Sequence, residues 1–293
     1  MCFGGKMNTM KIGRLLVLAT LLCSLAVSAL ALDFTDAHGN VIELDETLEA
    51  YTESTLIGAE NAARKEETNL GDLWADALYW FAASGTIDSY FEEDDVTAGN
   101  TQMAVDPDHI VALWNGGNLR ADVPEGKFGA EQLAEVLPYP NKVAIVYMTG
   151  AELSEALEAA SQALPYSEET ADACASFMQG SGLSYTVNTA AAYDKGEAYG
   201  DHWFRANSLG RVTIADVGGK PLQAEALYAV ITSNANFNGM DSSYIFKEAA
   251  EKNEKSTITT AGVRDVVWMY IASELNNVIG ETYRLPQGRI TIR

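Results

Sequence analysis

The sequence predicts an α/β protein in the broad (α+β) sense, in which a mixed β-sheet is flanked by helices. Two observations point to a sheet with helices on it: short runs of strand-forming residues recur along the chain, and longer segments carry apolar residues at a spacing of three and four. A third observation decides the class. Strands and helices follow one another without strict alternation, which favours a mixed sheet over a regularly wound parallel one.

Residues 1–31 have the pattern of a secretory signal peptide. Basic residues come first, the apolar run 15–26 follows, and Ala29-Leu30-Ala31 has the small-x-small form of a cleavage site. We expect cleavage after Ala31 and a secreted, periplasmic or cell-surface location. The sequence leaves open whether Met7 or Met10 is the true start. The run is too short to span a bilayer comfortably, so no membrane span is expected after cleavage.

The composition bears on the size of the core, on the kinds of partner and on disulfide bonds. Apolar residues make up 47% of the 293 residues, enough to bury a sizeable core. The formal net charge of −22 repels nucleic acid and anionic lipid, so we expect neither as a partner. Outside the predicted signal, Cys174 is the one cysteine, which leaves no partner for an internal disulfide.

The first part of the expected mature chain divides into an arm and the start of a domain. Residues 32–59 are polar and acidic and are interpreted as an N-terminal arm, and residues 60–293 as one domain. Apolar residues from Leu70 to Phe81 predict an amphipathic helix, with Thr68 or Asn69 placed to cap its first turn. Residues 87–107 lack periodicity and predict a solvated loop.

The segment 110–141 concentrates candidate binding chemistry. A strand is predicted over residues 110–114 and stops at Asn115-Gly116-Gly117, where a tight turn is possible. Arg120 follows with five donors suited to phosphate, carboxylate or paired hydroxyls. Tyr139 stands between two prolines and before Asn141, so an aromatic face and an amide are presented almost rigidly.

The rest of the chain supplies further elements of the mixed sheet. Thr149 to Glu152 forms a capping box that opens a helix. A hairpin turn is predicted at Gly218-Gly219. The other predicted elements are strands at residues 142–148, 177–187, 211–217 and 228–233 and a helix at residues 263–275.

Several stretches taken together resemble the C-terminal domain of the 5′-nucleotidases, the exported enzymes that hydrolyse nucleotides and nucleotide sugars. No single stretch is specific, but their order and spacing fit over nearly all of the expected mature chain. The stretches are residues 67–73 with 75–77, 115–120, 137–141, 178–183 with Tyr185, 217–222 and 239–241.

The resemblance implies a binding site for a nucleotide, nucleoside or nucleotide sugar. In that family arginines hold the phosphate-bearing and ribose side, two aromatic rings sandwich the base, and an acidic residue takes ribose hydroxyls. Carried over by motif, these positions are Arg64, Asn115, Arg120, Tyr139, Asn141 and Asp241.

The match departs from the family pattern at two positions near Asp241. The second aromatic of the sandwich lies six residues before the family's aspartate, where this chain has Ala235. Phe237 is the candidate replacement, on the condition that the segment re-routes or stays extended. Met240 stands where the family has a second glycine.

Hydrolysis in the family belongs to a separate N-terminal domain with two metal ions, and the resemblance here does not include it. Three histidines, His38, His109 and His202, do not provide the ligands of a two-metal site, so neither a catalytic residue nor a cofactor is expected in this chain. Three hypotheses stay open. The chain binds nucleotides alone, completes a nucleotidase with a metallophosphoesterase chain that carries the divalent metals, or is an interaction domain that lost its ligand.

Overall fold

A computed structural model describes residues 31–35, 39, 41–45, 49–59 and 61–293. All of the predicted signal peptide except its last residue lies outside these ranges, so its cleavage stays a prediction. In the part of the chain that the structure describes, no helix is long and apolar enough to cross a membrane.

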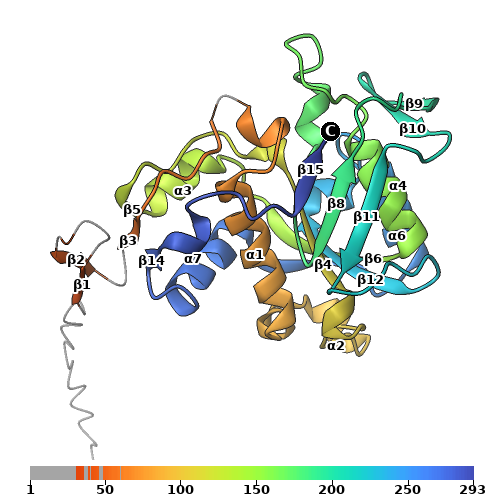
Figure 1. Ribbon diagram of the computed structural model, residues 1–293. Coiled ribbons are helices and arrows are strands. Elements are labelled where there is room, and N and C mark those ends of the chain that lie inside the picture. The colour runs from red at the N-terminus through yellow and green to blue at the C-terminus, as the bar shows by residue number, and fades with distance from the viewer. Residues whose placement is uncertain (1–30, 36–38, 40, 46–48, 60) are drawn as a thin grey trace, which may run out of the picture.

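A five-stranded mixed sheet forms the centre of the molecule (Figure 1). Its middle strand β12 (Leu227–Ser233) pairs in parallel with β4 (Ile110–Asn115) and antiparallel with β6 (Lys142–Thr149). The outer positions are taken by β13 (Thr257–Gly262) and β7 (Met178–Ser181). The predicted mixed sheet is therefore confirmed.

Both faces of this sheet are buried, because helices cover each of them. Ile110, Ala112 and Trp114 of β4 pack into a core with helices α1 (Asn69–Ala83) and α7 (Val263–Ser273). The alternate residues Val111 and Leu113 face a second core with helices α4 (Gly150–Ala160) and α6 (Tyr244–Lys252). Successive strand residues point to opposite faces, so one continuous apolar run supplies both cores.

Smaller sheets complete the architecture. Strand β8 (Leu183–Val187) pairs with β11 (Val212–Val217) and β15 (Ile290–Ile292), and β3 (Glu49–Thr52) pairs with β5 (Gly126–Gly129) and β14 (Val278–Ile279). Two hairpins remain, formed by β1 (Ala31–Thr35) with β2 (Val41–Asp45) and β9 (Lys195–Tyr199) with β10 (Trp203–Ala206).

Local capping signals are confirmed at two helices. The Thr68 hydroxyl oxygen accepts a hydrogen bond from the Gly71 backbone N–H at 3.0 Å, which caps α1. At α4 the Thr149 hydroxyl oxygen accepts from the Glu152 N–H at 3.2 Å, and the Glu152 carboxylate accepts from the Thr149 N–H at 2.9 Å. These reciprocal bonds are the predicted capping box.

Two predicted segments differ from the structure. Residues 87–107 are not a plain loop, because Ile87 and Phe91 pack into the core and the segment carries the 3₁₀ helix η2 (Thr86–Tyr90) and helix α2 (Glu93–Thr97). Residues 177–187 form two strands, since Gly182 takes a positive φ of 77° that sends the chain from one sheet to another. Elements that the sequence did not predict include α3 (Ala130–Val136), α5 (Asn234–Phe237), α6 and β13.

Two short 3₁₀ helices meet at a glycine. A Cβ on Gly116, at the start of η4 (Gly116–Asn118), would lie 1.7 Å from the carbonyl oxygen of Ala63 in η1 (Ala62–Arg64). The buried Gln179 side chain donates to that same Ala63 carbonyl at 2.9 Å. Only glycine allows this approach, which fixes η1 against the end of β4.

Gly116→Ala should destabilise the protein by about 1–3 kcal/mol, because the added methyl group overlaps a backbone carbonyl that Gln179 holds in place. Urea unfolding measures the change. Gly210→Ala is the matched control, since nothing lies within 4 Å of its added Cβ. Equal free energies of unfolding for the two variants would contradict the tight junction.

An acidic cluster joins α1 to the C-terminal segment. The Glu67 carboxylate accepts from the backbone N–H groups of Arg289 and Ile290 at 2.9 and 3.1 Å. The Arg289 guanidinium lies 2.7 Å from an Asp76 oxygen and 3.9 Å from Asp72, which is fully buried. Burial, and then the nearby Glu67 carboxylate, raise the pKa of Asp72 to about 8.

The raised pKa of Asp72 predicts a stability that falls with rising pH. The folded state keeps a proton on Asp72 up to about pH 8, whereas an unfolded Asp releases it near pH 3.8. This contribution is complete below about pH 4 and is lost by up to about 1.4 kcal/mol per pH unit toward pH 8. Asp72→Asn cannot titrate, so the stability of the wild type relative to this variant should fall between pH 5 and pH 8. Thermal unfolding at several pH values measures this, and a constant difference would refute it.

Candidate functional site

The candidate site lies along one edge of the central sheet. Because β12 runs parallel to β4 and antiparallel to β6, the carboxyl ends of β4 and β12 share this edge with the start of β6. Asn115 ends β4, Asn141 directly precedes β6, and the segment from Asn234 to Asp241 follows β12. The pairing therefore brings together loops that are far apart in the sequence.

Asn115 holds the turn at the end of β4. Its side chain is buried, and its side-chain oxygen Oδ1 accepts a hydrogen bond from the Asn118 side-chain amide at 2.9 Å. The Gly116 N–H donates to the Phe177 carbonyl at 2.7 Å. These bonds order η4, from which the chain continues to Arg120.

Arg120 and Tyr139, two of the candidate binding residues, lie in contact. The guanidinium Nη2 is 3.4 Å from the Tyr139 hydroxyl, and its Cζ lies 5.8 Å from the ring centroid. The Arg120 N–H donates to the Val136 carbonyl at 2.9 Å, which ties its loop to α3. Tyr139 is 44% exposed, so ring surface remains open to a ligand.

Arg64 and Asp241 complete a charged group with Arg120. Burial lowers the pKa of Arg64, and the neighbouring Arg120 charge lowers it further. Burial raises the pKa of the Asp241 carboxyl, while Arg64 and then Arg120 oppose that shift. Arg64 and Asp241 therefore both lie within electrostatic range of the Arg120 charge. The Arg64 guanidinium is held by the Ala171 carbonyl at 2.8 Å.

Asn234 is a site residue that the sequence analysis missed. Its side-chain oxygen accepts from the Lys142 N–H at 3.1 Å and from the Asn141 amide at 3.2 Å. A backbone N–H can only donate, so this arrangement fixes which end of each amide faces the other. Asn234 could not be found from a local sequence pattern, because its contact is with Asn141, 93 positions away in the sequence.

The aromatic position opposite Tyr139 differs from the family arrangement. Ala235 and Phe237 lie in the one-turn helix α5, not in an extended segment. Residues two apart point in different directions on a helix, so strand alternation does not carry Phe237 onto the face of Ala235. The Phe237 ring is half-buried and packs on the core between the sheet and helices α4 and α6.

Two histidines make ring contacts with neighbouring aromatic residues, and the third lies outside the described residues. His109 packs edge-on against Tyr228 with ring centroids 4.9 Å apart, and His202 packs similarly against Trp203 at 5.7 Å. His38 falls outside the described ranges. Within those ranges, no group of three or more His, Cys, Asp or Glu side chains is gathered as a metal site.

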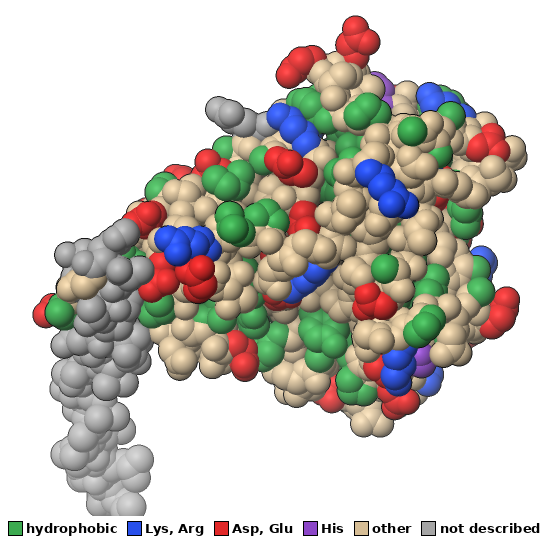
Figure 2. Space-filling view, viewed as in Figure 1, with side chains coloured by type: hydrophobic (Ala, Val, Ile, Leu, Met, Phe, Trp, Pro, Cys, Tyr) green, Lys and Arg blue, Asp and Glu red, His purple; other side chains and the backbone are tan. Residues whose placement is uncertain are grey.

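Arg64 and Arg120 lie in a protein whose surface is mainly acidic. Acidic side chains are spread over the face shown in Figure 2, with fewer lysines and arginines between them. The whole sequence has 41 acidic and 19 basic residues. An anion that reaches the site therefore depends on a local pair of cations against a repulsive long-range field.

Comparison with known proteins places these features in a family. Residues 48–248 match the family described as "5′-nucleotidase, C-terminal domain". The trifunctional nucleotide phosphoesterase protein YfkN of Bacillus subtilis (strain 168) is 29% identical over 136 residues, which cover 46% of this chain and 8% of that protein.

Solved structures agree on the fold. The 5′-nucleotidase precursor from Thermus thermophilus superposes with a TM-score of 0.57 and 26% identity, covering 83% of this chain and 39% of that one. The NAD nucleotidase of Haemophilus influenzae gives a TM-score of 0.55 at 15% identity, covering 83% of this chain and 38% of that one. This chain thus spans about two-fifths of the length of these solved relatives. Because the family match covers more than half of the chain, the chain belongs to the 5′-nucleotidase family, and the part of the family that it matches is the C-terminal domain.

Proposed function

We propose that this chain binds nucleotides or nucleosides at the sheet edge that carries Arg64, Arg120, Tyr139 and Asp241. The observation that supports it best is that two arginines and the half-buried Asp241 carboxyl lie within electrostatic range beside an exposed aromatic ring. Arginine suits phosphate, a carboxylate accepts from paired ribose hydroxyls, and an aromatic face stacks on a base. The three chemical parts of a nucleotide each find a matching group.

The arrangement favours ligands that carry a phosphate. The Arg120 charge helps to lower the pKa of Arg64, because like charges close together repel. A phosphate between the two arginines would relieve that repulsion and add charge-assisted hydrogen bonds. A nucleotide sugar offers the same phosphate groups and is included in the proposal.

Recognition of the base is expected to be weak. Tyr139 supplies one stacking face, whereas the opposite position is Ala235 and the Phe237 ring packs on the core. One face is worth on the order of 1–3 kcal/mol and discriminates little between bases. The same features would also suit an interaction domain that has lost its ligand, and binding measurements separate the two functions.

We further propose that any hydrolysis requires a metallophosphoesterase unit that holds the divalent metals. The family relatives named above are nucleotidases and phosphoesterases, and this chain matches a part of each. Export is proposed on the basic head, the apolar run and Ala29-Leu30-Ala31.

Titration calorimetry with AMP and adenosine tests the division of roles. Arg120→Ala should weaken AMP binding about 10- to 150-fold and adenosine much less, because it removes a charge-assisted contact. Tyr139→Ala should weaken both ligands alike, whereas Tyr139→Phe keeps the stacking face and should change little. Arg284→Ala is the matched control, since this exposed arginine pairs with Glu281. If AMP binds and neither Arg120→Ala nor Tyr139→Ala alters it, the ligand lies elsewhere.

Asp241→Asn should weaken adenosine more than 2′-deoxyadenosine, because an amide offers fewer acceptors to the two ribose hydroxyls. The raised pKa of Asp241 adds a pH dependence: the carboxylate gains its proton at a higher pH than an ordinary Asp. Adenosine affinity should fall as the pH drops through that range, and the variant should not show this fall. A loss of equal size for both nucleosides would argue against a ribose contact.

A further inference from the structure

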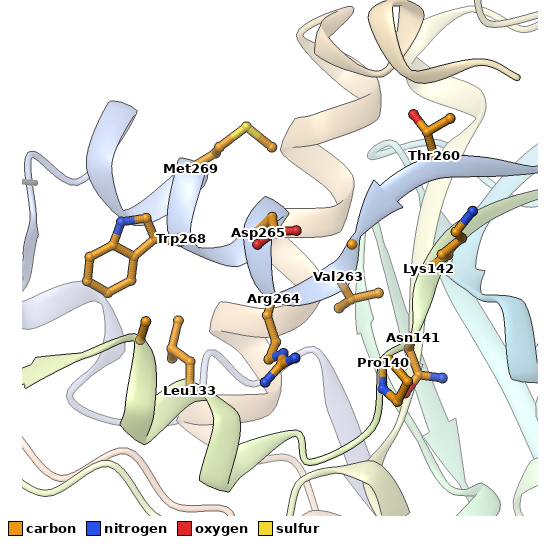
Figure 3. A pocket seen from close by; sticks show the side chains of 12 residues that line it. Leu133, Pro140, Asn141, Lys142, Thr260, Val263, Arg264, Asp265, Trp268 and Met269 are labelled. Atoms are coloured by element: carbon orange, nitrogen blue, oxygen red, sulfur yellow. The ribbon is translucent and has the colours of Figure 1, made fainter. Parts of the chain in front are cut away.

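A separate pocket lies between helices α3 and α7. Its volume is about 600 Å³, within the range of small-molecule sites. It begins behind the proposed site, because Pro140 and Asn141 line it just after Tyr139. Figure 3 shows its walls, with Leu133 on α3 and Trp268 on α7.

Arg264 is the distinctive group in this pocket. It lies in the first turn of α7 and reaches toward α3 in Figure 3. The side chain is half-buried, yet it makes no ion pair or hydrogen bond with any residue that the structure describes. An arginine without a carboxylate partner is notable in a chain with 41 acidic residues.

The guanidinium sets a geometric requirement on a ligand. Its planar fork of N–H donors is satisfied best by two acceptor atoms side by side, as on a carboxylate or on the O6/N7 edge of a guanine-like base. A single acceptor satisfies only part of it. The ligand edge that meets Arg264 should therefore carry paired acceptors.

The remaining walls define the body of the ligand. Leu133, Val263, Trp268 and Met269 give the pocket a mainly apolar lining. The indole of Trp268 packs edge-on against Phe128, with ring centroids 6.3 Å apart, which fixes its orientation. An apolar wall with a fixed aromatic ring suits a planar ring.

The other charges limit the net charge of the ligand. Lys142 lines the pocket but lies 3.3 Å from Glu92, so its charge is already balanced. Asp265 also lines the pocket and opposes Arg264. A neutral or singly charged ligand is compatible with this balance, whereas a multiply charged phosphate is disfavoured.

We propose that the α3–α7 pocket is a second binding site, for a planar ring that carries two adjacent acceptor atoms and docks them on Arg264. Two classes of compound carry such a ring with paired acceptors, the aromatic carboxylates and the oxo-purines. The proposal does not rest on the nucleotide site: Asn141 lines this pocket too, but Arg264 and Trp268, which carry the proposal, are not among the residues of that site.

The probes isolate this pocket by lacking ribose and phosphate. 9-Methylhypoxanthine carries the O6/N7 pair, 9-methylpurine lacks O6, and benzoate represents the carboxylates. Calorimetry gives the affinities, and the indole N–H signal of Trp268 in ¹⁵N spectra reports on the pocket itself. We expect 9-methylhypoxanthine or benzoate to bind and to shift that signal, and 9-methylpurine to bind more weakly.

Variants test the two contacts separately. Arg264→Gln should weaken the bound probe about 10- to 100-fold. Arg264→Lys keeps the positive charge but not the planar fork of donors. It should therefore restore the binding of the anionic benzoate more than that of the neutral 9-methylhypoxanthine. Ala130→Phe should fill the pocket from the exposed start of α3.

Each variant has a matched control. Ala151→Phe places the same ring at an exposed alanine in the first turn of α4, and Arg284→Gln removes an arginine outside the pocket. Both should bind the probes as the wild type does. The proposal is overturned if no paired-acceptor probe binds the wild type, or if binding is unchanged in both Arg264→Gln and Ala130→Phe. Selective loss in these two variants supports it, and the probe that binds identifies the source.

Discussion

The two different pairings of β12 are the constraint on which the rest of the structure depends. Parallel pairing with β4 and antiparallel pairing with β6 bring two strand ends and one strand start to the same edge. If β6 ran parallel to β12, the Tyr139 loop would lie at the opposite edge, away from Arg120. The mixed sheet is thus a condition for the site. Helices on both faces then make the sheet rigid enough to hold these loops in register.

The loops at this edge are held mainly by hydrogen bonds to backbone groups. Asp122 accepts from the Gly58 and Ala59 N–H groups, each at 2.7 Å, and so ties the chain after Arg120 to the chain before Arg64. Asn234 fastens the start of β6 in the same way. Such bonds fix the positions of the arginines, while their charged ends have no carboxylate of the described residues at hydrogen-bond distance. The proposed anion site depends on these two cations, because the cost of bringing their charges near each other is already met in folding.

Local sequence patterns were sufficient to predict the elements that are stabilised by interactions between neighbouring residues. The helix that begins after Thr68 and the capping box at Thr149 follow from neighbouring residues, and both are present. Long-range contacts were not predictable in this way. Segment 87–107 is ordered at its start because Ile87 and Phe91 pack into a core assembled from distant residues. For the site, the motifs named Arg120 and Tyr139, which lie in contact, but the Asn141–Asn234 bond depends on the strand order, which no motif displays.

The family motif around α1 does more for the frame than for the ligand. The Asn69 amide donates to the carbonyls of Thr55 and Tyr283 at 3.0 and 2.9 Å, and its oxygen accepts from the Ile57 N–H at 2.8 Å. Glu67 binds the backbone of the last strand, and a Cβ on Gly71 would lie 2.3 Å from the Gln179 side chain. These residues join segments more than 200 positions apart. A match to this motif therefore predicts the fold strongly, whereas the proposed ligand binding depends on a few groups at the sheet edge. This explains how the chain can retain the family fold with an alanine at position 235, where base recognition would need a ring.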